Sequence, residues 1–380
     1  MVGTRGVPAA YGGFETAIEE VGRRLVARGH EVVVYSRGER HPEREYLGMR
    51  IVHLPAVSQK QLDTPSHTAL SALHLVSRRR PDVAFVFNAA NSPFLPLLRL
   101  RGVPVALHMD GLEWRRAKWG GVGQAFYRRA EEFGVRTADA LIADAPGISD
   151  YYRDKFSVET ELIRYGAPLL DGLPADRLAE LDLTTHEYHL VVARFEPENH
   201  VREIVEGYRR SAASLPLLLV GSAPYAAEYR QAIEDAAGGD PRIRLVGSIY
   251  DQDLLDVLYA HASTYLHGHS VGGTNPSLLR AIGAGTPVVA YDVGFNREVV
   301  DDDGWFFSTP EQLAEQLAEI ESDPAAAVRR GVRNRHRAES AFSWDDVTSD
   351  YEDLARRLAC GESVHSTARR ARRREGAWVG

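Results

Sequence analysis

Short apolar runs rich in β-branched residues alternate along this chain with longer amphipathic stretches. The runs lie at residues 32–35, 50–54, 83–87, 104–108, 141–143, 161–163, 188–193, 217–220, 243–246, 264–267, 288–291 and 305–307. Continuous apolar runs of this kind are typical of parallel strands that helices cover on both faces. Repeated alternation of strand and helix therefore predicts an α/β fold rather than an α+β fold.

Residues 166–185 interrupt the alternation, because they are rich in Gly, Pro, Asp and Leu and show no clear periodicity. We place the domain boundary there and predict two doubly wound domains, at 1–168 and 169–340. A terminal helix is predicted at 341–360, followed by a disordered basic tail at 361–380. Because ligands of open α/β sheets bind at the carboxyl ends of the strands, two such domains favour a two-substrate enzyme with an interdomain cleft.

The predicted terminal helix carries an apolar stripe at helical spacing. The stripe consists of Trp344, Val347, Tyr351, Leu354 and Leu358. We expect this face to be buried.

Composition and charge narrow the class of function. The chain has 44% hydrophobic and 26% charged residues, as ordinary globular proteins do. A net charge of −8 argues against a general nucleic-acid binder. The tail at 361–380 has five arginines and two glutamates, so it carries +3 and the remainder carries −11. We expect this tail to contact an anionic membrane surface.

The chain shows no signal for secretion or membrane insertion. Its one cysteine, Cys360, cannot form an internal disulfide. No stretch reaches the roughly 20 apolar residues that span a membrane, and the N-terminus lacks a signal peptide's apolar core. We expect a cytoplasmic protein, peripheral at the inner membrane face through its tail. Since only Met1 and Val2 precede the first glycine, the first strand is either very short or begins upstream of this sequence.

A glycine-rich block at residues 3–16 leads into an amphipathic helix that stops at Gly29. Glycines at a helix N-terminus allow close approach of an anion such as phosphate to the backbone N–H groups. The spacing matches neither the dinucleotide fingerprint nor the P-loop. Gly12 and Gly13 therefore indicate either a phosphate-binding loop or a tight strand-to-helix turn.

Arg194 directly follows the first apolar run of the second half. A guanidinium at the carboxyl end of a strand can bind a diphosphate through two parallel hydrogen bonds. The alternative is a solvated turn with a surface Arg–Glu pair, which contributes little to stability. The position at the end of the strand favours the functional interpretation.

A second pair of glycines, Gly272 and Gly273, precedes a helix. Asn275 is a good N-cap and Pro276 a good first helical residue, so the helix is predicted to begin there. The exposed N–H groups of the glycines would form a second anion site.

Two histidines and two acidic clusters could suggest a metal. His267 and His269 supply only two ligands without an evident third, so a polar contact or a simple strand end is favoured for each. Asp251 and Asp253 open a helix, where acids favour the helix dipole. Residues 301–304 end in a turn signal. We predict no metal site.

Together these blocks resemble glycosyltransferase family 4, the retaining enzymes of the GT-B fold. Residues 3–16 and 110–119 are most similar to a bacterial subgroup that includes rhamnosyltransferase-like polysaccharide enzymes. The resemblance covers residues 2–358 and implies two Rossmann-like domains facing a cleft, with the terminal helix crossing back to the first domain. It also implies transfer of a sugar from a nucleoside diphosphate to an acceptor hydroxyl, with no further cofactor.

The resemblance assigns roles position by position. It implies donor binding by Gly12, Gly13, Arg194, Asn199, Gly221, Ile249, Tyr250, His269, Gly273, Thr274, Asn275, Leu279 and Arg280. It implies catalysis through Arg194, Asp110, Gly272 and Gly273, and acceptor binding by His108, Glu113, Arg115 and Lys118. For His108 an equal alternative is a structural role at the end of its strand, with its hydrogen bonds satisfied within the protein.

The chain departs from the family pattern at three positions. Asn199 stands where the family often has a lysine, and Gly272 and Arg280 stand at the two ends of the E-x7-E motif. Arginine has only donors and cannot accept from a ribose hydroxyl. We expect Arg280 to pair with phosphate and replace the charge missing at Asn199. The alternatives are a non-catalytic nucleotide-sugar-binding scaffold and an epimerase, which would need carboxylates not found in these motifs.

Overall fold

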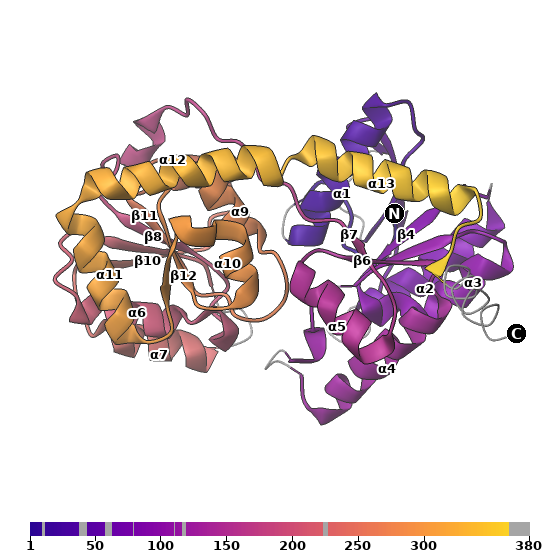
Figure 1. The fold of residues 1–380 in the computed structure, drawn as a ribbon, viewed down its shortest axis with the longest axis horizontal. Helices are drawn as coiled ribbons and strands as arrows, with labels where there is room; N and C mark the ends of the chain where they lie inside the picture. The colour runs from indigo at the N-terminus through magenta and orange to yellow at the C-terminus, as the bar shows by residue number, and fades with distance from the viewer. Residues whose placement is uncertain are drawn as a thin grey trace, which may run out of the picture. The chain divides into compact units, whose positions relative to one another are not determined.

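The computed structural model describes residues 1–9, 12–37, 44–57, 63–78, 80–109, 111–115, 119–222 and 227–364 (Figure 1). The chain divides into two compact units, each described here by itself. Unit 1 comprises Met1–Tyr165 and Trp344–Gly380, and unit 2 comprises Gly166–Ser343. The division falls three residues before the predicted boundary. Residues 365–380, which hold the arginines of the predicted tail, lie outside the described residues.

Every apolar run identified in the sequence forms a strand. In unit 1 these are β1 (Val33–Arg37), β3 (Met49–Leu54), β4 (Ala84–Phe87), β5 (Val105–His108), β6 (Ala140–Ala143) and β7 (Glu161–Leu162). In unit 2 they are β8 (His189–Val192), β9 (Leu217–Val220), β10 (Ile243–Gly247), β11 (Thr264–His267), β12 (Val288–Tyr291) and β13 (Trp305–Phe307). Sequence reasoning missed β2 (Glu45–Tyr46), a two-residue strand too short for a hydrophobic pattern.

Helices alternate with these strands. Unit 1 contains α1 (Gly13–Ala27), α2 (Asp63–Ser77), α3 (Leu95–Leu100), α4 (Gly121–Thr137), α5 (Pro146–Phe156), α13 (Trp344–Ala359) and the 3-10 helices η1 (Ala89–Phe94) and η2 (Glu113–Arg115). Unit 2 contains α6 (Val201–Arg210), α7 (Ala227–Ala237), α8 (Gln252–Ala260), α9 (Pro276–Gly283), α10 (Gly294–Val300), α11 (Pro310–Ser322), α12 (Pro324–Ala341), η3 (Ala175–Leu181), η4 (Pro197–Asn199) and η5 (Asp301–Asp303). This confirms the predicted α/β fold.

In unit 1 the first two residues join two sheets. The strand orders are β2-β3-β1 and β4-β5-β6-β7. The N–H of Val2 donates to the carbonyl of Phe85 at 2.9 Å, and the N–H of Tyr35 donates to the carbonyl of Met1 at 3.1 Å. Met1 and Val2 thus lie between β1 and β4 and act as the central strand, although Val2 forms only an isolated parallel bridge with Val86.

In unit 2 a single parallel sheet has the order β10-β9-β8-β11-β12-β13. Its central strands are buried on both faces, because helices cover the sheet on each side. Register is regular across the centre: Leu190 pairs with Leu218 on one side and with Tyr265 on the other. The order reverses between β8 and β11, so the loops that follow these two strands diverge there.

The helix α13 packs against α1 within unit 1, although more than 300 residues separate some of their partners. All five residues of the stripe predicted for this helix are buried, which confirms that expectation. The ring of Tyr351 meets the ring of Phe85 edge-on, with centroids 5.1 Å apart. Apolar burial, which is proportional to area, is the main force that holds the helix on this unit.

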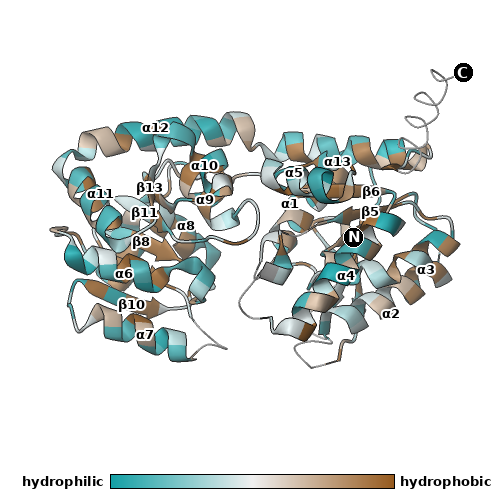
Figure 2. Cartoon of the chain, turned by 60° about the horizontal axis from the view of Figure 1, so that its bottom comes forward, coloured by the Kyte–Doolittle hydropathy of each residue, from teal (hydrophilic) through white to brown (hydrophobic). Residues whose placement is uncertain are grey.

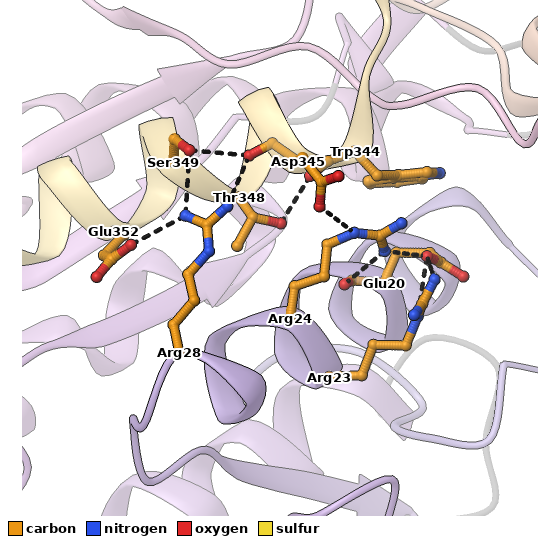
Figure 3. Close-up of polar contacts among 9 residues, drawn as sticks. All are labelled: Glu20, Arg23, Arg24, Arg28, Trp344, Asp345, Thr348, Ser349 and Glu352. Carbon is orange, nitrogen blue, oxygen red and sulfur yellow. Dashed lines mark hydrogen bonds and ion pairs between the residues drawn. The ribbon is translucent and has the colours of Figure 1, made fainter.

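Polar contacts along the rim fix the register of the two helices (Figure 3). Arg28 donates to Glu352 Oε2 at 2.9 Å and to Ser349 Oγ at 3.1 Å. Its other nitrogen donates to the carbonyl of Asp345 at 3.0 Å. Arg24 Nε donates to Asp345 Oδ1 at 3.0 Å. Because Arg28 donates to a carboxylate, a hydroxyl and a main-chain carbonyl of α13, these contacts define one alignment of α13 on α1.

Acid should weaken this contact through Glu352. Hydrogen bonds from His30 and Arg28 hold the pKa of the Glu352 carboxyl at about 2, below its usual 4.5. A carboxyl with a lowered pKa stabilises the folded state above its unfolded pKa, and this contribution disappears as the pH falls from about 4.5 toward 2. We expect Glu352→Gln to lower the melting temperature at neutral pH, and the difference from wild type to shrink progressively below about pH 4.5.

The matched control for this measurement is Asp353→Asn on the exposed side of α13, whose side chain is 69% exposed. It should show no comparable pH-dependent difference. A Glu352→Gln difference that stays constant between neutral and acid pH would contradict the assignment.

Candidate functional site

The donor residues predicted for unit 2 gather at the carboxyl ends of its central strands. Arg194 and Asn199 lie in the loop after β8, and His269 lies in the loop after β11. These are the two strands at which the sheet order reverses. In open α/β sheets such a point forms a crevice that binds ligands. The structure therefore brings together residues that are about 70 positions apart in the sequence.

Asn199 joins the two loops. The Nδ1 of His269 donates to Asn199 Oδ1 at 2.7 Å, and the Nδ2 of Asn199 donates to the carbonyl of Arg194 at 2.7 Å. Because a carbonyl oxygen only accepts, the proton on the His269 ring is on Nδ1 in this contact. Asn199 is buried, and both polar atoms of its side chain serve these loops. A lysine at this position would lose both hydrogen bonds.

The main chains of the two loops also approach closely. The N–H of Ser270 donates to the carbonyl of Glu198 at 2.9 Å, and His200 Nδ1 donates to the carbonyl of Gly268 at 2.8 Å. A Cβ on Gly268 would lie 2.0 Å from the carbonyl oxygen of Asn199. Only glycine fits there.

The guanidinium of Arg194 is partly accessible. Its side chain is 37% exposed, and Nη1 lies 3.5 Å from Glu196 Oε2. The Arg–Glu pair considered as the alternative from sequence is thus present. At this exposure the pair contributes little to stability, so the guanidinium can exchange Glu196 for a more strongly bound anion. The structure shows the pair with Glu196, and binding of a diphosphate by Arg194 stays a prediction.

The loop before α9 has the expected form. Asn275 caps the helix, because its Oδ1 accepts from the N–H of Ser277 at 2.9 Å, and Pro276 is the first helical residue. Gly272 has a φ of 126°, which glycine adopts without strain. Thr274 is buried. The positive end of the helix dipole lies at this N-terminus, where it favours an anion.

His267 is the last residue of β11 and is buried. The sequence analysis did not decide between a polar contact and a simple strand end for this residue. Its Nδ1 lies 3.3 Å from the hydroxyl of Tyr265, and its Nε2 has no hydrogen-bond partner. Burial lowers the pKa of this imidazole to about 3, so the ring is neutral at physiological pH. Within the described ranges, no group of three or more His, Cys, Asp or Glu side chains is arranged to hold a metal ion.

Gly221, Ile249 and Tyr250 follow the neighbouring strands β9 and β10. A Cβ on Gly221 would lie 1.8 Å from the carbonyl oxygen of Ala193, so this loop also depends on a close main-chain approach. Ile249 is half-buried, and Tyr250 is 75% exposed. A large exposed ring beside a crevice offers a surface for stacking.

Two predicted donor residues on α9 have other environments. The side chain of Leu279 is fully buried in the core. Arg280 forms an ion pair with Asp256 of α8, and each of these side chains is 19% exposed. Sequence reasoning missed Asp256 because it lies 24 residues away, on a different helix. The charge of Arg280 is therefore already balanced within the protein.

In unit 1 carboxylates of α1 accept hydrogen bonds from the N–H groups of two residues of the glycine-rich loop. The N–H of Arg5 donates to Glu15 Oε1 at 2.9 Å, and that of Ala9 donates to Glu19 Oε2 at 2.7 Å. Gly12, with a φ of 116°, precedes the first residue of α1, Gly13. A Cβ on Gly12 would lie 2.4 Å from Glu15 Oε2. Burial raises the pKa of the Glu15 carboxyl, which favours its neutral form beside these glycines.

His108 lies at the end of β5 among aromatic rings. It stacks on Phe87 and Tyr165 with centroids 5.5 and 6.0 Å away, and Phe14 meets it edge-on at 5.0 Å. The residue is 2% exposed, and burial lowers its pKa to about 3. Its Nδ1 has no hydrogen-bond partner. The structure thus places His108 in the core beside the glycine-rich loop, as a neutral ring.

Glu113 lines a small recess in unit 1. The recess has a volume of about 10 Å³, room for about one water or hydroxyl group. Its lining consists of Asn88, Ala89, Gly111, Leu112, Glu113, Trp114, Tyr127, Glu131 and Tyr152. Glu113 Oε1 accepts a hydrogen bond from Trp119 Nε1 at 3.2 Å. Asp110, Lys118 and the side chain of Arg115, which were also predicted here, lie outside the described residues.

Glu131 is the residue of this recess that sequence reasoning missed. It is 3% exposed, its Oε2 lies 3.5 Å from Lys155 Nζ, and its Oε1 has no hydrogen-bond partner. A buried carboxylate oxygen without a partner costs free energy. The signal was present in the sequence: a glutamate within the buried stripe of α4, between Ala130 and Gly134.

Comparisons with known proteins give a family for each unit. Residues 12–166 match a family model described as "Glycosyl transferase 4-like domain", and residues 178–337 match one described as "Glycosyl transferases group 1". Glycogen synthase of Mycobacterium tuberculosis is 25% identical in an alignment that covers 92% of this chain and 92% of its own. O-antigen chain mannosyltransferase B of Escherichia coli is 26% identical over 45% of this chain and 46% of its own.

Solved structures share the fold. Sucrose-phosphate synthase from Thermosynechococcus elongatus has a TM-score of 0.79 at 22% identity, over 91% of this chain and 94% of that one. HepE from Anabaena in complex with UDP-glucose has a TM-score of 0.74 at 15% identity, over 92% and 98%. The two family models together cover most of the sequence. This chain therefore belongs to the glycosyltransferases of the GT-B fold, with a 4-like first domain and a group 1 second domain, and is an enzyme of that family.

Proposed function

We propose that this protein is a retaining glycosyltransferase that moves a hexosyl or deoxyhexosyl group, such as rhamnosyl, from a nucleoside-diphosphate sugar to an acceptor hydroxyl. The acceptor would be a glycan, a lipid-linked sugar or a small molecule. The observation that carries the proposal is the pair of loops joined by Asn199 and His269 at the switch point of unit 2. Arg194 follows β8 and the N-terminus of α9 follows β11, so both lie on the side of the sheet where these strands end.

Related proteins support a nucleotide-sugar donor. The structure of HepE with UDP-glucose shares this fold, and two of the similar proteins are named as enzymes that transfer or polymerise sugars. We assign donor binding to unit 2 and acceptor binding to unit 1, as the family resemblance implies. Neither comparison names a rhamnosyltransferase, so the identity of the sugar rests on the resemblance of residues 3–16 and 110–119 alone.

The chemistry requires stabilisation of a departing diphosphate. The bond between the anomeric carbon and the diphosphate oxygen breaks, and the acceptor oxygen bonds to that carbon on the same face. The acceptor proton passes to the departing diphosphate. Donors already aimed at the developing negative charge lower this barrier without a metal ion. Arg194 and the N–H groups of Gly272 and Gly273 are the groups that we assign to this role.

The recess in unit 1 suits an acceptor hydroxyl. Glu113 and Glu131 supply carboxylate oxygens, and Trp114 and Tyr127 supply aromatic faces. Carboxylates accept hydrogen bonds from hydroxyls, and aromatic rings pack against the apolar face of a sugar. Since the recess holds only about one hydroxyl-sized group, we infer that one hydroxyl of the acceptor enters it while the ring stays outside.

A nucleotide-sugar-binding scaffold is the second candidate. It is favoured by Arg280, which stands where the resemblance expects a ribose-binding glutamate and which pairs with Asp256. A transferase turns over the sugar nucleotide, whereas a scaffold only binds it. Incubation with a panel of sugar nucleotides should release nucleoside diphosphate slowly with water as acceptor, and faster with the correct acceptor. Binding without any release would favour the scaffold.

Arg194→Ala should weaken binding of nucleoside diphosphate. A hydrogen bond between a charged donor and phosphate contributes about 1.5–3 kcal/mol, so one lost bond corresponds to roughly 10- to 100-fold weaker binding. Calorimetric titration of UDP measures the effect. The control is Arg202→Ala on α6, whose side chain is 51% exposed and pairs with Glu206.

The same titration and the turnover assay are run with and without EDTA. Unchanged affinity in Arg194→Ala would show that this guanidinium does not bind the donor. Turnover that disappears with EDTA and returns with manganese would contradict the metal-independent mechanism.

Asp256→Asn tests whether Arg280 reaches the diphosphate. The substitution keeps the shape of the side chain but removes the charge that balances Arg280. If Arg280 contacts phosphate, binding of nucleoside diphosphate should become roughly two- to fivefold tighter, because the arginine no longer leaves an ion pair. Asp253→Asn on the same helix, which faces solvent, is the control. Equal affinity of wild type, Asp256→Asn and Asp253→Asn for nucleoside diphosphate would show that Arg280 does not contact the donor.

Glu131→Gln tests the acceptor recess. The amide is isosteric but replaces one accepting oxygen with a donor, so hydrogen bonding to the acceptor hydroxyl should weaken. We expect the KM for the acceptor to rise roughly three- to tenfold, with the affinity for UDP unchanged. Its neighbour Glu132 is exposed, and Glu132→Gln is the matched control. A changed UDP affinity with an unchanged acceptor KM would contradict the assignment.

A further inference from the structure

The outward face of α4 in unit 1 combines exposed apolar side chains with arginines. Val122, Phe126 and Phe133 are 90%, 43% and 38% exposed. They are separated by four and seven positions, so they lie along one face of the helix. Arg129 and Arg136 are exposed and share this face, since each lies three positions after one of the phenylalanines. We name these five residues the α4 stripe.

The end of α3 extends this surface. Arg99 Nη1 donates to the carbonyl of Thr137, the last residue of α4, at 2.7 Å, so the C-terminal ends of the two helices lie together. Leu100 and Arg101 follow, and Leu100 is 82% exposed. In Figure 2 hydrophobic and hydrophilic positions alternate on α3 and α4, which lie side by side in unit 1.

The chain returns to this end of α4 before the basic tail. The N–H of Val364 donates to the carbonyl of Asp139, two residues beyond the last residue of α4, at 2.8 Å. The residues that follow, 365–380, include five arginines and one glutamate. Val364, the last described residue, therefore lies close to the C-terminal end of α4.

The distribution of charge indicates which kind of surface the α4 stripe binds. The chain carries −8 overall, so an anionic surface repels most of the protein. The exposed charged residues of α4 are three arginines and one glutamate, Arg128, Arg129, Arg136 and Glu132. A basic helix face with exposed aromatic residues is typical of proteins that lie on a membrane surface. The apolar groups enter the interface while the arginines meet lipid phosphates.

We propose that the α4 stripe, together with Leu100, docks unit 1 onto an anionic lipid bilayer. Association of two copies through the same stripe is less favourable, because a symmetric contact would place its arginines opposite one another with only Glu132 to balance them. Among the described residues, no helix is long and apolar enough to cross a bilayer. The contact is therefore a surface attachment of the described part of the chain.

Sedimentation with vesicles tests the proposal on the full chain. We compare vesicles made of equal amounts of phosphatidylglycerol and phosphatidylcholine with vesicles of phosphatidylcholine alone. Wild type should bind the anionic vesicles preferentially. Phe126→Ser/Phe133→Ser should weaken binding roughly tenfold or more, because the apolar contact is lost. Arg129→Gln/Arg136→Gln should weaken it at low salt and reduce its dependence on salt.

The matched control changes two exposed apolar residues of unit 2. Val328 and Val332 of α12 are 57% and 51% exposed, and Val328→Ser/Val332→Ser should bind vesicles as wild type does. Circular dichroism and melting temperature verify that each variant is folded. Light scattering of each protein reports its oligomeric state. Truncation after Val364 should weaken binding less than the two α4 variants combined.

Several outcomes would overturn the proposal. Equal binding of wild type to both kinds of vesicle, or wild-type binding by both α4 variants, would do so. Dissociation of a dimer by Phe126→Ser/Phe133→Ser with unchanged vesicle binding would instead assign the stripe to self-association. None of these variants alters a residue assigned to donor or acceptor binding, so turnover of a soluble acceptor should stay at the wild-type level. The vesicle measurement does not depend on turnover. It would therefore still test the α4 stripe if the protein proved not to be a transferase.

Discussion

The close approach of two main-chain loops at the centre of unit 2 is the constraint on which the proposed donor site depends. The strand order reverses between β8 and β11, so the loops after these strands would diverge without a link. Gly268 lets them meet, because any Cβ would collide with the carbonyl of Asn199. Asn199 and His269 then hold them at a fixed separation. Arg194 is attached to this link through its own carbonyl, which Asn199 binds, so the main chain at the arginine is anchored before a ligand arrives.

Buried polar groups in the two units are accommodated in different ways. Asn199 satisfies both sides of its amide within the loops, so its burial carries little penalty. His267 and His108 are neutral because burial disfavours their charged forms, and each keeps one nitrogen without a partner. Glu131 likewise keeps one carboxylate oxygen without a partner. Unpartnered polar atoms of this kind occur where a protein meets a ligand or stores strain, and three of them lie at or near the carboxyl ends of central strands or beside the recess of unit 1.

Unit 1 is completed by segments from both ends of the sequence. Met1 and Val2 fill the gap between β1 and β4 and turn two sheets into one continuous layer. The helix α13 covers α1 with an apolar stripe and a rim of arginine and carboxylate contacts. Because these contacts are long-range, loss of either segment would expose core surface of unit 1. The same long-range arrangement brings the start of the basic tail to the end of α4.

The sequence by itself determined the α/β class, the position of each long strand and the caps of α9, since hydrophobic periodicity and capping are local properties. It also determined the family, because the glycine-rich block, Arg194 and the Gly272–Asn275 loop stand in order along the chain. Only the tertiary structure decided what each side chain meets. It paired Arg280 with Asp256, used Asn199 to join two loops, enclosed His108 among aromatic rings and left Glu131 facing a recess. These outcomes depend on residues 21 to 94 positions apart that come together only when helices pack on the sheets. No local pattern encodes which distant partner a side chain finds.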